Sequence, residues 1–408
     1  MKRVEILAGI LVVVTLVALL ACWLCSDSAK ETVADASRCS RLIAEVKPAA
    51  VRSRPETKEA EAKSEPSETE QAPVFEVGGR KFRSLQGAVD AANDGDTITL
   101  TGDAYVRNPV AVRKSLNFNL NGFRLVAKNS KLAFRGRSGR FAAGSHAITV
   151  FGDKQVTVEN GFIDVDSNGG TGGFSGAVEK VPDPAAEVVQ EPTNDDWKFD
   201  TVLRDLEVAT DAPRDAAFRN AEGKMLIDNC TVSATGGNGS YTIGLGSETT
   251  IRDCTFNTTG TDGGYSWWNN TVAVAFDGKT VVESGTYVTQ MAEGVEGTTY
   301  GTYVYSSGGT IEVRDGEFQA DQVARADRDV AQYTDGGVSE VVVKDGTLSG
   351  KMVSVQTGVE PDAEAVSGVS AYGGVYDNAP NAEQVPEGKV VVDYGDGTYS
   401  VDNGVSVR

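Results

Sequence analysis

The sequence predicts an all-β solenoid, in which short strands stack on one another coil after coil. Three observations predict it. A short phrase recurs eight times between residues 158 and 376, a second apolar phrase precedes most copies, and no helical periodicity separates the copies. Several short strands in every 24–31 residues are typical of a repeat architecture in which each repeat contacts only its neighbours.

Each copy reads apolar-x-x-(Gly or Cys, once Leu)-x-apolar, as in Ile227–Val232 and Val313–Phe318. The fourth positions fall at residues 161, 206, 230, 254, 285, 316, 346 and 374. The spacing between neighbouring copies is therefore 24–31 residues, except for a first gap of 45. We expect this first gap to hide another coil or to hold a long loop.

The columns of the repeat have consistent chemistry. The first, fourth and sixth positions are apolar or small in nearly every copy, which suits residues that point into a shared core. The third position favours turns and in most cases tolerates left-handed backbone; it holds Asn160, Asp205, Asn229, Asp253, Ser284, Asp315 and Asp345. The second position alternates in charge for six of seven copies: Glu159, Arg204, Asp228, Arg252, Glu283, Arg314 and Lys344. In parallel strands ~4.8 Å apart, these residues would form cross-strand ion pairs on the solvent face.

The segment before the repeats predicts a cover for the open end of the solenoid. Phe75–Phe82 reads as a hairpin with a Gly-Gly turn, and Ser84 is a suitable N-cap for a short helix. The apolar face of this helix contains Leu85, Ala88, Val89 and Ala92. A strand follows at Thr97–Leu100. An amphipathic helix protects the unpaired edges at a solenoid end.

These residues resemble a known family. Ser84–Leu100 and then Leu116–Gly122 are similar to the opening of pectate-lyase-like right-handed parallel β-helix proteins. Val391–Val401 resembles the tail of surface β-helix proteins of Gram-positive gut bacteria. The resemblance covers about residues 75–401 and implies a right-handed parallel β-helix with an N-terminal capping helix. It implies no single activity, because this fold hosts lyases, hydrolases, epimerases, phage tailspikes and adhesins.

Residues 1–25 predict a transmembrane anchor. Ile6–Leu24 contains nineteen apolar or small residues without a charge and follows Lys2 and Arg3. This pattern predicts a cytoplasmic N-terminus and an extracellular remainder at the cell membrane. The alternatives are a cleaved signal segment and a lipoprotein that is cleaved and acylated at Cys22.

Residues 26–73 predict a disordered stalk, because this segment is rich in Ala, Glu, Lys, Ser, Thr and Pro and has no aromatic residue. The solenoid domain then spans residues 74–408.

Composition excludes several classes of function. The chain has 38 Lys and Arg against 58 Asp and Glu, a net charge of -20, which argues against binding nucleic acid or anionic lipid headgroups. One histidine, His146, is too few for a His-rich metal cage. We find no phosphate loop, nucleophile elbow or zinc spacing, and we predict no cofactor and no metal site. Calcium is the one ion that the many carboxylates leave open, although no D-x-D-x-D-G loop is present.

The first candidate site is a charged cluster. Acidic-polysaccharide enzymes of the resembling fold use Asp, Arg and Lys on the outer face of one sheet, which points to Asp228, Arg252, Asp253 and Glu283. A glycosidase would need two carboxyl groups ~5–9.5 Å apart, one of them with a raised pKa. A structural charge ladder explains the same residues more economically, because the alternation extends over several copies and a catalytic constellation has no reason to repeat.

The second candidate site is an aromatic loop at Trp267, Trp268, Asn269 and Asn270. Exposed aromatic rings beside amides suit a sugar, because the rings stack on the pyranose and the amides bind its hydroxyl groups. The alternative is packing of these rings against the solenoid wall. The same two interpretations apply to Trp197, within the 167–200 insertion.

Cys230 and Cys254 share one column in neighbouring copies, which would place their Cα atoms ~4.8 Å apart. This distance allows a disulfide outside the cell, and two stacked free thiols are the alternative.

From the sequence we expect a non-catalytic adhesion or glycan-binding module whose partner is an extracellular glycan or a host or bacterial surface protein. The alternative is a carbohydrate-active enzyme, either a polysaccharide lyase or a glycoside hydrolase. A structural spacer of the cell envelope is a third interpretation.

Overall fold

The computed structural model describes residues 71–128, 136–138, 141–143, 146–166, 176–183, 199–211, 215–261, 269–329, 338–357 and 368–404. All of them belong to one compact unit, residues 66–408. The predicted anchor with Cys22, the stalk up to residue 70, Trp197, Trp267 and Trp268 lie outside the described residues. Within the described ranges, no helix is both long enough and apolar enough to cross a membrane.

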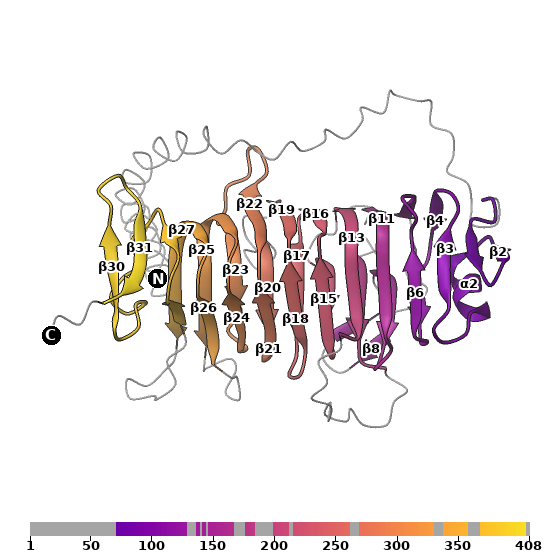
Figure 1. The fold of residues 1–408 in the computed structure, drawn as a ribbon, viewed down its shortest axis with the longest axis horizontal. Coiled ribbons are helices and arrows are strands. Elements are labelled where there is room, and N and C mark those ends of the chain that lie inside the picture. Colours follow the sequence, from indigo (N-terminus) through magenta and orange to yellow (C-terminus); the bar gives the residue numbers. More distant parts are fainter. Residues whose placement is uncertain are drawn as a thin grey trace, which may run out of the picture. The chain divides into compact units, whose positions relative to one another are not determined.

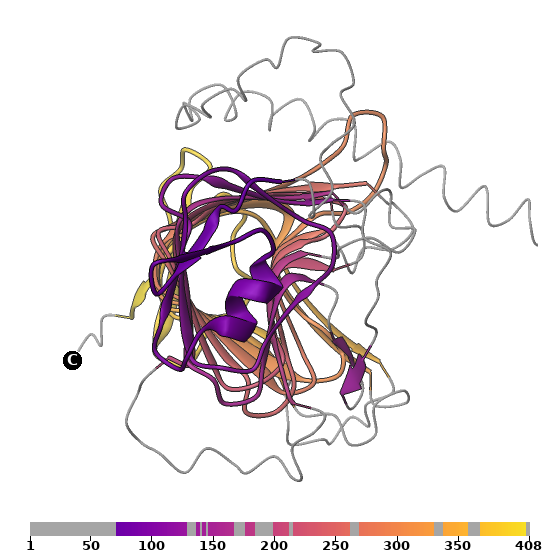
Figure 2. The same ribbon diagram turned by 90° about the vertical axis from the view of Figure 1, so that its right-hand side faces the viewer.

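The N-terminal cap forms as its sequence predicts. β1 (Phe75–Val77) pairs antiparallel with β2 (Arg80–Phe82) and with β3 (Thr97–Leu100). α2 (Leu85–Ala91) lies between β2 and β3, and its N-cap Ser84 accepts a hydrogen bond of 3.1 Å from the Gly87 N–H. The helix buries its predicted apolar face at the N-terminal end of the solenoid (Figures 1 and 2). It therefore covers the open end of the core.

From β3 onward the chain winds in coils of three strands, and each strand pairs in parallel with its counterpart in the next coil. Sheet A takes the first strand of each coil: β5 (Val110–Val112), β10 (His146–Phe151), β12 (Gly176–Val181), β14 (Ala216–Asn220), β17 (Asn238–Ile243), β20 (Asn270–Ala275), β23 (Tyr300–Val304), and the second halves of β25 (Glu317–Asp329) and β27 (Thr347–Thr357).

Sheet B takes the second strand: β3, β6 (Leu116–Asn119), the first halves of β11 (Val156–Asp166) and β13 (Thr201–Thr210), β15 (Lys224–Asp228), β18 (Glu248–Arg252), β21 (Gly278–Val282), β24 (Gly309–Val313), β26 (Ser339–Val343) and β28 (Gly368–Ala371).

Sheet C takes the third strand: β4 (Ala104–Val106), β7 (Arg124–Lys128), the second halves of β11 and β13, β16 (Thr231–Thr235), β19 (Cys254–Gly260), β22 (Gly285–Met291), the first halves of β25 and β27, and β29 (Val375–Tyr376). An end-on view shows the coils stacked behind one another (Figure 2). β8 (Gly136–Ser138) and β9 (Phe141–Ala143) form a separate hairpin. The parallel solenoid that the sequence predicts is therefore present.

The interior is built from columns of equivalent residues. One column crosses sheet B with every member fully buried: Ile98, Phe118, Val158, Leu203, Ile227, Ile251, Val282, Val313, Val343 and Ala371. A second column in sheet C contains three aromatic rings. Phe256 meets Tyr287 edge to face with ring centroids 5.4 Å apart, and Tyr287 stacks on Phe318 with ring centroids 4.5 Å apart. The first and sixth positions of the repeat thus point inward, as predicted.

The 45 residues between the first two copies of the repeat phrase form a single coil, with no additional coil between them. β10 and β12 are direct neighbours in sheet A, and β11 and β13 are direct neighbours in sheets B and C. The extra length falls in the two connections that flank β12, residues 167–175 and 184–198, which lie outside the described residues.

The predicted left-handed turns are present in the early coils. Asn160, Asp205, Asn229 and Asp253 have φ angles of 50–63°, and Asn121 repeats this conformation one coil earlier with φ 54°. In the later coils Asp315 and Asp345 bond their own turns by accepting hydrogen bonds from the next backbone N–H, but the left-handed residue there is the next one along the chain. Gly285, Gly316, Gly346 and Gly374 have φ angles of 97–130°.

Packing explains this shift from the third position to the fourth. A Cβ atom on Gly285 would lie 2.3 Å from the Cys254 carbonyl oxygen and 2.8 Å from the Tyr287 hydroxyl. The large ring at the sixth position occupies the space that a fourth side chain would need. The Tyr287 hydroxyl then donates a 2.7 Å hydrogen bond to the Ser284 carbonyl, so that the ring also stabilises the turn.

We expect Ile227→Asp or Phe256→Asp to unfold the solenoid cooperatively, because either change buries an unpaired charge in a fully buried column. The loss should exceed about 4 kcal/mol, measured as the shift of thermal unfolding followed by circular dichroism. Ser233→Asp, on the exposed face of β16, is the matched control and should cost less than about 1 kcal/mol. A parent-like melting curve for either core variant would contradict the packing described above.

The two kinds of turn should respond differently to substitution. Gly285→Ala should lower the unfolding free energy by more than about 1 kcal/mol, because it adds both left-handed strain and a close contact with Cys254. Asp253→Gly should cost less than that, because glycine adopts the left-handed conformation freely. Chemical denaturation of both variants measures the difference, and equal losses would show that backbone conformation does not limit these turns.

Candidate functional site

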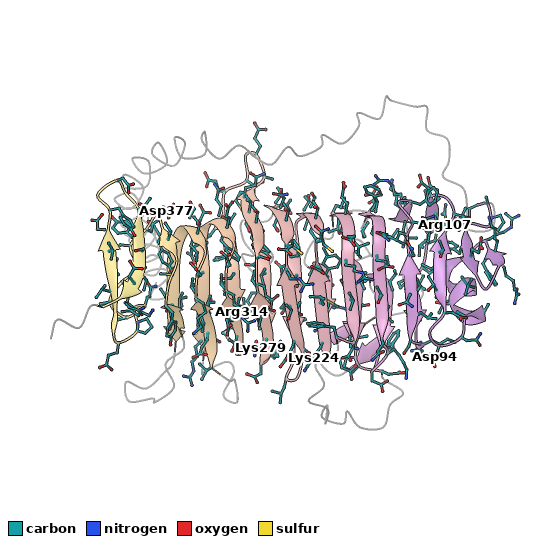
Figure 3. The ribbon with its side chains drawn as sticks, viewed as in Figure 1. Asp94, Arg107, Lys224, Lys279, Arg314 and Asp377 are labelled. Atoms are coloured by element: carbon teal, nitrogen blue, oxygen red, sulfur yellow. The ribbon has the colours of Figure 1, made fainter. Side chains whose placement is uncertain are left out.

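The charge ladder forms three cross-strand ion pairs between neighbouring coils. Arg204 Nη2 lies 2.6 Å from Glu159 Oε2, and Arg314 Nη1 lies 3.3 Å from Glu283 Oε1. Arg252 donates two hydrogen bonds to the two oxygens of Asp228, of 2.9 and 2.7 Å. Arg314, the last arginine of this ladder, is labelled in Figure 3. The predicted ion pairs are therefore present on the exposed side of sheet B.

The four residues considered for catalysis lie on adjacent coils, yet their contacts favour the ladder. The hydrogen bonds from Arg252 hold the pKa of Asp228 below its usual range, which is the opposite of what a general acid needs. Asp253 accepts a 2.7 Å hydrogen bond from the Ser284 hydroxyl, and its backbone N–H donates to the same hydroxyl. Glu283 pairs with Arg314. These side chains stabilise turns and neighbouring strands.

The two asparagines of the predicted aromatic loop are buried, which corrects the expectation that their amides face solvent. Asn269 and Asn270 are 1% and 0% exposed. The amide of Asn270 donates to Asn238 Oδ1 at 3.0 Å and to the Tyr305 hydroxyl at 3.1 Å. Asn270 follows the loop at the start of β20, where its side chain joins a buried polar cluster. Trp267 and Trp268 lie outside the described residues, so their contact with a glycan stays a prediction.

Cys230 and Cys254 stack in neighbouring coils, as their shared column predicts, and the structure has both as buried free thiols. The backbone N–H of Cys230 donates to Cys254 Sγ at 3.4 Å. The Cys254 thiol and burial together raise the pKa of the Cys230 thiol well above its usual value. Two free thiols packed in the core correspond to the second of the two alternatives considered for this pair.

Sheet A contains a buried ionic cluster on its outward side that sequence reasoning missed. Glu179 contacts the Arg219 guanidinium and accepts a 2.7 Å hydrogen bond from Thr149, while Arg219 Nη1 lies 3.0 Å from Asp215 Oδ2. His146 Nδ1 lies 3.5 Å from Glu179. Burial alone would raise the pKa of Glu179, but Arg219 and His146 hold it well below its usual range. The sequence gives no hint of this cluster, because the strands of sheet A are buried on both faces and lack the alternation that marks the strands of the other two sheets.

Further along the same side of sheet A, the cluster continues as an aromatic one. The ring centroid of Tyr303 lies 5.0 Å from that of Tyr300 and 4.5 Å from that of Tyr305. The Arg325 guanidinium lies 5.2 Å from the ring centroids of both Tyr300 and Tyr303. All three tyrosines are buried, so this surface acts as a second core.

An open groove with a volume of about 600 Å³ follows the corner between sheets B and C. We call it the corner groove; its lining is Asn121, Gly122, Asn160, Gly161, Phe162, Asp205, Leu206, Glu207 and Asn229. The left-handed turns build it, because each early coil places an Asn or Asp at this corner. Asn229 Nδ2 donates to Asp205 Oδ1 at 2.6 Å, which links two of these turns along the groove.

Phe162 gives the corner groove an apolar surface. Its side chain is half-buried, and the Arg124 guanidinium lies 4.9 Å from the ring centroid and is held by a 2.5 Å ion pair with Asp164. Around the ring, the exposed amides of Asn121 and Asn160 offer donors and acceptors, and the carboxylates offer acceptors. Together these groups can donate hydrogen bonds to the hydroxyl groups of a ligand and accept hydrogen bonds from them.

A second cluster lies where sheet A turns into sheet B. The fully buried Lys180 amine donates a 2.9 Å hydrogen bond to the Gly152 carbonyl and lies 3.6 Å from Asp200 Oδ2. Burial lowers the pKa of Lys180 and raises that of nearby Glu222. Glu222 Oε2 is buried and accepts no hydrogen bond from any described residue. Sequence reasoning missed this cluster because neither residue belongs to the repeat phrase.

Within the described ranges, no group of three or more His, Cys, Asp or Glu side chains is placed to hold a metal ion. Comparisons of the chain with protein-family models, with curated proteins and with solved structures find no match.

The Glu179 cluster predicts a loss of stability in acid. Because the folded pKa of Glu179 lies below its unfolded value, the ionised carboxylate stabilises the fold above about pH 4, and this contribution is lost as the pH falls toward the folded pKa. Glu179→Gln should lower the unfolding free energy by about 3 kcal/mol at neutral pH and flatten the acid slope. Melting temperatures of parent and variant from pH 7 to pH 3 measure both effects.

Asp228→Asn is the matched control for Glu179→Gln, because Asp228 also pairs with an arginine but does so at the surface. It should cost less than about 1 kcal/mol. If the two variants lose equal stability, the buried cluster contributes no more than a surface ion pair.

Proposed function

We propose that this protein is a membrane-anchored extracellular solenoid that binds glycans without cleaving them, and that the corner groove is its binding site. The observation that carries the proposal is the pairing of the Phe162 ring with exposed amides and carboxylates along one open groove. A pyranose presents an apolar face to an aromatic ring and hydroxyl groups to its rim, which these residues match. The net charge of -20 favours a neutral or cationic glycan over a polyanion.

The finer fold assignment and the location belong to the same proposal. We place the chain among right-handed, pectate-lyase-like β-helices, because parallel strands joined by crossovers in one sheet are right-handed in about 98% of cases. The apolar segment Ile6–Leu24 would anchor it in the membrane, and residues 26–73 would hold the solenoid away from the surface. A glycan or a glycosylated surface protein then becomes its partner outside the cell.

Retention of residues 66–408 on immobilised plant, mucin and bacterial polysaccharides tests the proposal. Phe162→Ala should weaken binding about tenfold, because it removes the ring that stacks on the sugar. Tyr372→Ala is the matched control, since Tyr372 is an exposed ring that also carries a cation, Lys344, at 3.8 Å. Loss of binding on Trp267→Ala with Trp268→Ala, but not on Phe162→Ala, would move the site to the aromatic loop.

A carbohydrate-active enzyme is the second candidate, and Glu222 is the observation that favours it. A carboxyl group with a raised pKa beside a second carboxylate, here Asp200, is what acid-catalysed glycosidic cleavage needs. Release of new reducing ends from the same polysaccharides, lost in Glu222→Gln, would support this candidate. Release that survives Glu222→Gln but disappears in Asp253→Asn would place the chemistry on the charge ladder instead. Retention without release supports the binding proposal.

A further inference from the structure

The C-terminal end of the solenoid presents an edge strand. β30 (Lys389–Asp393) and β31 (Tyr399–Asn403) form an antiparallel hairpin, and β31 also pairs antiparallel with β29. Among the described strands, β30 has β31 as its one neighbour. It is the outermost strand at this end of the molecule (Figure 1). The other edge of β30 therefore pairs with no strand in the part of the chain that the structure describes.

The register of the hairpin shows which backbone groups lie on that edge. The Gly404 N–H donates to the Gly388 carbonyl at 2.8 Å, and the Tyr394 N–H donates to the Thr398 carbonyl at 3.1 Å. Antiparallel strands alternate between residues that bond across the pair and residues that point away from it. The even-numbered residues of β30 thus face β31, and the backbone groups of Val391 and Asp393 and the Lys389 carbonyl point outward, while the Lys389 N–H donates to the Pro386 carbonyl at 3.1 Å.

The side chains of this hairpin are unusually apolar for an exposed edge. Val390 is 45% exposed, Val391 37% and the following Tyr394 58%. Exposed edges are normally blunted by charges or prolines, because free backbone groups beside apolar side chains pair with other chains. Within β30 the charges stand at the two ends, and they have opposite signs.

We propose that β30 is the contact surface for a second copy of this chain, with the two β30 strands paired antiparallel about a two-fold axis at Val391. In this register the outward groups of Val391 bond their equivalents in the other copy, and the Asp393 N–H of each copy meets the Lys389 carbonyl of the other. An isologous contact of this kind closes after two copies and joins the two solenoids end to end.

Charge complementarity selects this register over its neighbours. A two-fold axis at Val391 places Lys389 of each copy opposite Asp393 of the other, so that one strand supplies two ion pairs across the contact. The registers one step away, which also match the outward backbone groups, would leave at least one of these charges opposite a valine or beyond the strand. The selected register also sets the ring of Tyr394 opposite Gly388, where no side chain competes for the space.

The same complementarity favours a second copy over an unrelated strand. Any extended peptide could meet the backbone groups of an edge. To match both charges, however, a partner strand must place Asp opposite Lys389 and Lys opposite Asp393, four residues apart. The antiparallel copy of Lys389–Asp393 has that order by symmetry. If the charges only guarded the edge, their removal would instead increase association.

The test uses charge reversals in the full chain, held in mild detergent and analysed by sedimentation over a range of high concentrations, because one strand pair makes a weak contact. Lys389→Asp and Asp393→Lys each place like charges opposite each other and should raise the dissociation constant of the dimer about tenfold or more. The double variant restores both pairs and should associate like the parent. Val391→Pro, which removes an outward N–H but no bond to β31, should also abolish association.

Mixing the two single variants gives the sharpest outcome. Lys389→Asp chains carry two acids and Asp393→Lys chains two lysines, so a mixed dimer matches every charge while neither variant pairs well with itself. Co-purification of the two differently tagged variants, each monomeric alone and with the melting temperature of the parent, is the expected result. A parent that is monomeric at every concentration, or a dimer that both reversals and the mixture leave unchanged, would overturn the proposal.

Discussion

Parallel stacking in constant register is the constraint on which the rest of the structure depends. Because each strand pairs with its counterpart one coil later, a strand side chain lies directly above and below the side chains at the same position, except at an irregularity between β25 and β27 near Gln322. A column therefore shares one environment along its length. The ten fully buried residues of the sheet B column, from Ile98 to Ala371, satisfy this constraint with apolar side chains alone. The same geometry turns alternating charges at the end of that sheet into ion pairs between coils.

Where a column cannot be apolar, stacking makes its members partners of one another. In sheet A, Glu179 and Arg219 are register neighbours that neutralise each other while buried. Tyr303 and Arg325 are register neighbours further along the same column, and the guanidinium packs against the ring. Such pairs need both partners, because a single buried charge would be left unpaired. The cost of losing one member thus extends to the neighbouring coils.

Features that recur in every coil could be predicted from the sequence, whereas most features that occur only once could not. The inward columns, the turn residues, the charge ladder and the capping helix each follow from local chemistry repeated at a near-constant spacing. The outward side of sheet A could not be predicted, since its strands are buried on both faces and show no alternation. Asn270 was assigned to an exposed sugar-binding loop because it follows two tryptophans, but its amide nitrogen donates inside to Asn238 and Tyr305. Glu222 and Lys180 interact through the connections between sheets, where sequence spacing varies.

The turn between sheets B and C links this packing rule to the proposed binding site. From Asn121 onward each coil has a left-handed residue at that corner, and the chain supplies it in two ways. Asn or Asp at the third position keeps a polar side chain at the corner, and the lining of the corner groove follows these turns from Asn121 to Asn229. Glycine at the fourth position, as at Gly285, brings no side chain and lets the sixth-position ring fill the core. Packing thus limits the turn at individual coils: the Cys254 carbonyl and the Tyr287 hydroxyl leave no room for a Cβ atom at Gly285, whereas the coil of Asp253 keeps its left-handed Asx turn although Phe256 fills the same interior column.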